Sequence, residues 1–214
     1  MKTQLRTASF AFFVALCLSL AVVPAMADET LYSNGPYDGQ TNAWMVSNGS
    51  AVSDSFNLGK AAQIKAISFV AWVYPGSTPN YIEFSITSDE FGGATYSTSK
   101  SNIKTPTILG TNEFGYQLDQ VTVDGLSINL DAGSYWLNIQ KVLTDTGDPV
   151  FWDQNSGPSM ASQDSLGTIP SESFEILGGD QSGGGATPEP SSLVLFGSGI
   201  LGLGGVLRKH LRVG

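Results

Sequence analysis

The sequence predicts an all-β domain, a β-sandwich of jelly-roll-like form, flanked by a cleaved signal peptide and a single C-terminal transmembrane helix. Short apolar runs with a two-residue period recur along the middle of the chain, and turn residues separate them. Outside the two end segments, no helical period is sustained. Several short strands at this spacing are typical of a β-sandwich.

The strand predictions depend on which residues alternate along each run. Residues 67–74 are apolar on both faces, which is typical of a central strand. Residues 81–87 alternate, with Ile82, Phe84 and Ile86 on the face expected to point inward. The other predicted strands are 50–58, 120–123, 126–130, 134–140, 150–152 and 173–177.

The N-terminal 27 residues have the three parts of a secretory signal. Basic residues precede the apolar run 8–23, and small residues at Ala25 and Ala27 form the expected cleavage site of signal peptidase. The mature chain would then begin at Asp28. An uncleaved N-terminal anchor is the alternative interpretation.

The rest of the chain can also be divided into consecutive segments. Residues 28–180 form the predicted extracellular domain, residues 181–187 a glycine-rich linker and residues 188–212 a terminal signal. Within that signal, the predicted helix 191–207 would be about 25 Å long at about 1.5 Å per residue, close to the thickness of a bilayer core. Its flanking elements are the motif Pro188, Glu189 and Pro190 before it and the basic stop-transfer residues Arg208, Lys209 and Arg212 after it.

This order of Pro-Glu-Pro, apolar span and basic tail resembles the PEP-CTERM sorting signal of exported bacterial proteins. The resemblance implies that an exosortase, a membrane-embedded protease, recognises Pro188, Glu189 and Pro190. It also implies transient anchoring in the inner membrane by the C-terminal helix, followed by a cell-surface or extracellular location. Proteins with this signal are associated with exopolysaccharide and biofilm, so exopolysaccharide is an expected partner.

Charge and composition narrow the chemistry of the middle domain. The formal net charge is −9, and every acidic residue except Glu189 lies within the domain. A surface of this charge repels phosphate backbones, so no nucleic-acid partner is expected. The domain has no arginine, and the only histidine, His210, and only cysteine, Cys17, lie in the end segments. Nucleophilic triads and zinc sites built on His or Cys are thereby excluded from it.

A pair of carboxylates is the main catalytic arrangement that this composition still allows. A secreted, carboxylate-dependent glycoside-active enzyme is therefore an alternative function, although solvated surface acids explain the same residues and we predict no enzymatic activity. The candidate carboxylates are Glu83, Glu113, Asp153, Glu172 and Glu175.

Two ligand sites can be suggested from local sequence. Asp145, Asp148 and Asp153 surround a Gly-Pro turn and would suit Ca²⁺, although a role as turn-forming acids explains the same residues; no other cofactor is expected. Trp152, which ends a predicted strand, could stack on a sugar if it were exposed, although tryptophans in strands usually fill the core. Asp153, Gln154 and Asn155 would then supply hydrogen bonds to hydroxyl groups.

The sequence thus predicts a non-enzymatic surface or matrix protein that acts by adhesion or carbohydrate binding. The glycoside-active enzyme and a purely structural matrix component are the alternatives. An exposed aromatic strip without a facing carboxylate pair would favour binding over catalysis.

Overall fold

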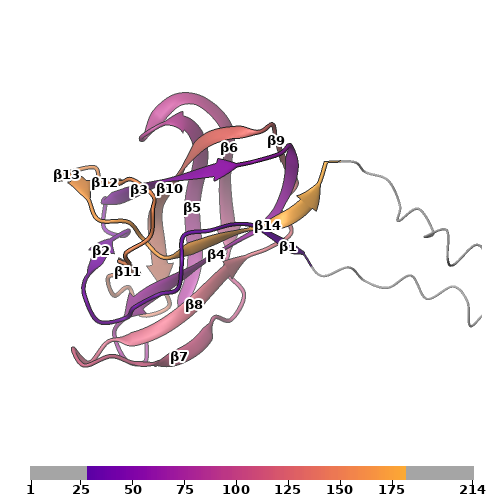
Figure 1. Cartoon of the computed structure of the whole chain (residues 1–214). Helices are drawn as coiled ribbons and strands as arrows, with labels where there is room; N and C mark the ends of the chain where they lie inside the picture. Colours follow the sequence, from indigo (N-terminus) through magenta and orange to yellow (C-terminus); the bar gives the residue numbers. More distant parts are fainter. Residues whose placement is uncertain (1–27, 182–214) are drawn as a thin grey trace, which may run out of the picture. The chain divides into compact units, whose positions relative to one another are not determined.

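Two β-sheets make up the part of the chain that the computed structural model describes, residues 28–181 (Figure 1). The predicted signal peptide and the whole terminal signal from residue 188 lie outside the described residues. No helix occurs in the described range, so the all-β prediction is confirmed there. Within residues 28–181, no helix is found with the length and apolar character needed to cross a membrane.

The larger sheet has eight strands in the order β1-β14-β4-β11-β2, with β8 and β9 paired to β4 and β7 paired to β8. These strands are β1 (Glu29–Ser33), β2 (Ala43–Met45), β4 (Ala62–Val73), β7 (Thr107–Thr111), β8 (Gln117–Val123), β9 (Ile128–Leu130), β11 (Phe151–Asp153) and β14 (Phe174–Asp180). β1 pairs antiparallel with β14, so the domain begins and ends on neighbouring strands.

The smaller sheet has six strands in the order β13-β12-β3-β10-β5-β6. These strands are β3 (Ala51–Leu58), β5 (Pro79–Asp89), β6 (Gly92–Asn102), β10 (Gly133–Thr144), β12 (Ala161–Gln163) and β13 (Gly167–Ile169). β10 pairs antiparallel with both β3 and β5. The two sheets pack face to face as a sandwich (Figure 1).

The inward faces of the two sheets form one apolar core. Ile82, Phe84 and Ile86 of β5 are at most 1% exposed, which confirms the predicted alternation. Phe69 and Val73 of β4 enter the same core from the opposite sheet. β4 is paired on both of its edges, as its two apolar faces predicted.

Six strands of the structure were not predicted from local sequence, namely β1, β2, β6, β7, β12 and β13. β6 is an edge strand rich in Ser and Thr, and its side chains are mostly exposed. A polar edge strand lacks the apolar alternation on which strand prediction depends, and its polarity protects the sheet edge from pairing with other chains. The other five have only three to five residues, too short to display a period.

Candidate functional site

An aromatic surface lies on the outer side of the larger sheet. Trp72 comes from β4 and Phe151 from β11, while Tyr74 follows β4, Tyr116 precedes β8 and Phe114 lies in the turn between β7 and β8. These five residues are called the aromatic face below. They are brought together by strand pairing between segments that are far apart in the chain.

The register of β4 explains why these rings gather. Trp72 is paired with Leu118 of β8 on one side and with Phe151 of β11 on the other. Since side chains alternate along a strand, Val70 and Trp72 point away from the core that Phe69 enters. Val70, Trp72 and Leu118 form a second apolar cluster, separate from the main core.

The rings of the aromatic face contact one another directly. Phe114 stacks on Trp72, with ring centroids 5.8 Å apart and an angle of 24° between the planes. Tyr116 has its ring centroid 5.2 Å from that of Tyr74 and 5.7 Å from that of Phe151. These separations are in the range that favours aromatic pairs.

Two members of the aromatic face are open to solvent. Phe114 is 56% exposed and Tyr74 43% exposed, while Trp72 beneath them is only 5% exposed. The outer face of an antiparallel sandwich sheet is normally polar. The contacting, partly exposed rings therefore depart from the usual polarity of an outer sheet face, and they form the candidate site on this sheet.

Asp153 fixes the position of Trp72. Its Oδ1 accepts a hydrogen bond of 2.6 Å from the indole Nε1 of Trp72 and one of 2.9 Å from the backbone N–H of Gly39. The backbone N–H of Asp38 donates to its Oδ2 at 3.2 Å. Burial raises the pKa of the Asp153 carboxyl to about 6, although the hydrogen bonds from Trp72, Asp38 and Gly39 act in the opposite direction.

A polar cleft of about 390 Å³ adjoins the aromatic face through Leu118. Tyr37, which is 41% exposed, lines this cleft. Gly39 holds the cleft wall close to the sheet, because a Cβ on Gly39 would lie 2.7 Å from Cδ1 of Leu118. The side chains of this cleft that can form hydrogen bonds include Asp38, Gln40, Thr111 and Asn112.

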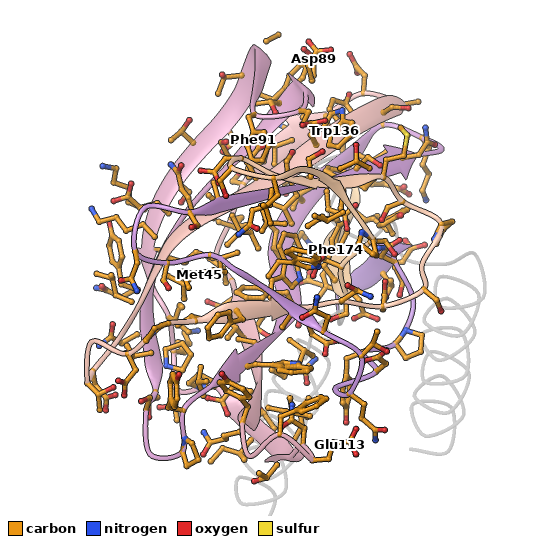
Figure 2. The ribbon with its side chains drawn as sticks, turned by 90° about the vertical axis from the view of Figure 1, so that its left-hand side faces the viewer. Met45, Asp89, Phe91, Glu113, Trp136 and Phe174 are labelled. Carbon is orange, nitrogen blue, oxygen red and sulfur yellow. The ribbon has the colours of Figure 1, made fainter. Side chains whose placement is uncertain are left out.

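A second cleft, of about 530 Å³, lies on the outer side of the smaller sheet. Trp136 of β10 lines it, together with Met160 and the carboxylate residue Glu90. Figure 2 shows Trp136 near Phe91 and Asp89 at one end of the sandwich, with Glu113 at the opposite end. Glu90 is the only carboxylate among the residues that line this cleft, so the cleft offers one aromatic ring and no facing carboxylate pair.

Trp152, which could have stacked on a sugar only if it were exposed, lies in the core. Trp152 is 0% exposed, packs edge-on against Phe69 and Phe174, and donates its indole N–H to the backbone oxygen of Ser173 at 2.8 Å. Strand β11 turns Phe151 outward and Trp152 into the core. Trp152 therefore cannot stack on a sugar.

The residues after Trp152 are likewise engaged in structural contacts. Asp153 is buried beneath the loop that contains Gly39, and Gln154 accepts a hydrogen bond of 3.1 Å from the indole of Trp44. Asn155 is 7% exposed and donates to the backbone oxygens of Asn34 and Pro36. Of the four residues suggested for a sugar site, Trp152 and Asp153 are thus buried, while Asn155 lines the cleft of the smaller sheet.

The three aspartates suggested for Ca²⁺ make separate contacts. Asp145 accepts from the backbone N–H of Thr78, and Asp148 accepts from the hydroxyl of Ser77, so both fasten a loop at the end of β10. Asp153 instead contacts Trp72 on the outer face of the larger sheet. Among residues 28–181, no three His, Cys, Asp or Glu side chains are grouped to hold a metal.

The candidate catalytic carboxylates form no accessible pair. Asp153 and Glu172 lie close enough for the charge of Asp153 to raise the pKa of Glu172, but both side chains are buried. Glu83 pairs with Lys141 at 2.9 Å and Lys100 at 3.6 Å, and these lysines hold its pKa below the ordinary value, together with a hydrogen bond from Tyr81. Glu172 is wholly buried, and Glu113 lies in the turn beside Phe114. Neither of the two clefts described above is lined by any of the five candidates.

Comparison with known proteins identifies the C-terminal segment. Residues 186–209 match the family model of the PEP-CTERM protein-sorting motif. No match is found among curated proteins. The matched segment includes Pro188, Glu189 and Pro190 and follows the β-sandwich in the chain. The match therefore identifies a sorting signal. The activity of the sandwich has to be inferred from the surface of the sandwich itself.

Proposed function

We propose, from the PEP-CTERM protein-sorting motif at residues 186–209, that this chain is an exported carbohydrate-binding protein of the cell surface or extracellular matrix. The motif indicates an exported protein that is anchored through its C-terminal region and processed by an exosortase-type membrane protein. Signal peptidase would remove residues 1–27 and the exosortase would act at Pro188 to Pro190. The sandwich would then be delivered to a polysaccharide-rich surface.

The aromatic face carries the binding part of this proposal. Pyranose rings have apolar faces that stack on aromatic side chains, and Phe114 and Tyr74 present such rings to solvent. Trp72 and Tyr116 support them from below through ring contacts. The adjoining cleft supplies Gln40 and other polar side chains that could bind sugar hydroxyls.

The strand order supports a jelly-roll topology for the sandwich. The principal strands follow β1-β14-β4-β8 in one sheet and β3-β10-β5-β6 in the other. Apart from the hairpin of β5 and β6, consecutive principal strands thus cross from one sheet to the other in the manner of two Greek keys. The aromatic face lies on the outer side of the larger sheet, a position that would let an extended polysaccharide chain reach it.

Removal of single exposed rings tests the binding proposal. We expect Phe114→Ala and Tyr74→Ala each to weaken binding to exopolysaccharide extracted from the same cells about fivefold, since a stacking contact contributes on the order of 1 kcal/mol. Affinity electrophoresis or a pull-down with the full chain would measure the change. Tyr96→Ala is the matched control, because Tyr96 is 48% exposed but belongs to β6 of the other sheet.

Three results would contradict the proposal. Parent protein that does not bind the extracted polysaccharide would favour a purely structural matrix component. Unchanged binding by both Phe114→Ala and Tyr74→Ala would remove the aromatic face as the site. Loss of binding only on Trp136→Ala would move the site to the cleft of the smaller sheet.

A further inference from the structure

Two acidic side chains lie inside the sandwich. Asp54 is on the inward side of β3, between the buried residues Val52 and Phe56, and it is 0% exposed. Strand pairing places Leu137 and Ala161 on its two sides. A carboxylate in such an apolar position is strongly disfavoured unless something neutralises it.

Glu172 meets Asp54 from the opposite sheet. It is also 0% exposed and precedes Phe174, which enters the core two residues later, so both side chains point inward. The backbone N–H of Glu172 donates to Oδ2 of Asp54 at 2.7 Å. Burial, with the negative charges of Asp54 and Asp153 added to it, raises the pKa of Glu172 well above its ordinary value.

Three carboxyl oxygens of this pair have no hydrogen-bond partner within the described part of the chain. They are Oδ1 of Asp54 and both Oε1 and Oε2 of Glu172. Leaving a charged oxygen buried without a partner costs several kcal/mol. If Glu172 were simply protonated, its hydroxyl would be a donor in need of an acceptor, yet neither of its oxygens makes a bond.

No positive side chain compensates the pair within residues 28–181. This range contains no arginine. Its lysines form ion pairs with other carboxylates, Lys60 with Glu29, Lys65 with Asp28, Lys100 and Lys141 with Glu83, and Lys104 with Asp124. The charge must therefore be balanced by a proton or by an ion from solution.

The surroundings of the pair are rich in neutral oxygen atoms. Asn34 is 0% exposed and donates to the backbone oxygen of Glu172 and to Oγ of Ser159, both at 2.6 Å. The hydroxyl of Tyr32 donates to Oδ1 of Asn34 at 3.0 Å. Carboxylate, carbonyl and hydroxyl oxygens without histidine or cysteine are the donor set of hard cations such as Ca²⁺.

We propose that Asp54 and Glu172 together bind a divalent cation of the Ca²⁺ type inside the sandwich. The three unpartnered carboxyl oxygens would coordinate the cation. The cation would thereby link β3 of the smaller sheet to the segment that precedes β14 of the larger sheet. This site is distinct from Asp145 and Asp148 in the loop after β10, and it is independent of the proposed binding of carbohydrate. The bound cation would hold the two sheets together when the protein is in an extracellular medium that contains calcium.

Calcium titration of the full chain in non-ionic detergent, stripped with EDTA, tests the site. We expect millimolar or tighter binding of Ca²⁺ and a rise in the unfolding midpoint of about 5 °C at saturation. Terbium should also bind, and its luminescence should be excited through nearby aromatic rings such as Tyr32. The variants Asp54→Asn and Glu172→Gln should fold but lose both responses.

Asp145→Asn and Asp148→Asn are the matched controls and should retain both responses. Loss of calcium binding in either control, with retention in Asp54→Asn, would place the ion in the loop and overturn the proposal. A parent protein that shows neither a calcium shift nor terbium luminescence would also overturn it, because the two carboxyls would then be balanced by protons alone. Neither result depends on whether the aromatic face binds carbohydrate.

Discussion

Replacement of Trp152 by alanine is expected to lower the free energy of unfolding by about 3–5 kcal/mol, the range found when a large buried aromatic ring is removed. Trp152 is wholly buried, and it contacts Phe69 and Phe174 with ring centroids 5.8 and 5.7 Å away. The ring thus joins β4, β11 and β14 of the larger sheet. Denaturant unfolding of the exported protein, monitored by circular dichroism, would measure the loss.

Trp152→Phe provides the matched control for this experiment. Phenylalanine keeps an aromatic ring between Phe69 and Phe174 but cannot donate to the backbone oxygen of Ser173. Its effect should be roughly 1–3 kcal/mol, smaller than that of alanine, because a buried acceptor loses its partner while most packing remains. Equal stability of the parent and Trp152→Ala would show that Trp152 is not in the core.

Asp153 is expected to make the domain less stable as the pH rises. Its pKa is raised from 3.8 to about 6 by burial, so the folded state binds a proton more tightly than the unfolded state does. The resulting stability is fully present below about pH 4 and is lost as the pH rises through about 6. The full loss corresponds to about 3 kcal/mol, at about 1.4 kcal/mol for each pKa unit.

The measurement compares parent and Asp153→Asn by denaturant unfolding at several values between about pH 4 and pH 7. Other buried acids also titrate, so the quantity of interest is the difference between the two slopes of unfolding free energy against pH. The parent should lose more stability than the variant over this window. Parallel slopes would mean that the carboxyl of Asp153 titrates at an ordinary pKa despite its burial.

The sequence predicts long alternating strands well and short ones poorly. Ile82, Phe84 and Ile86 point inward as expected, since an eleven-residue strand repeats the two-residue period several times. β11 has only three residues, so its period could not decide whether Phe151 or Trp152 faces the core. The sequence therefore left the orientation of Trp152 open.

The candidate surface could be predicted only in part. The second apolar face of β4, with Val70, Trp72 and Tyr74, is visible in the sequence as an alternation opposite to Phe69. Phe114 and Phe151 join that face through pairing of β4 with β8 and β11, which no local pattern reveals.

The buried acid pair has a weak sequence signal that becomes clear only in the structure. Asp54 occupies the middle of the alternation Val52, Asp54, Phe56, at a position where an apolar residue would be expected. Glu172 lies in a segment with no regular period, and its burial follows from the isolated bridge to Gln154. An acidic residue on the apolar face of a predicted strand is therefore a candidate for a buried side chain that coordinates a metal ion.

The intact mass of the protein recovered from the surface and medium of its native cells tests the central claim most directly. Export with processing at both ends predicts a chain that begins at Asp28 and ends between Pro188 and Pro190, with any attached sugar as added mass. A mass that includes the sequence through Gly214 would contradict processing at the PEP-CTERM motif and would indicate a protein that keeps its C-terminal segment.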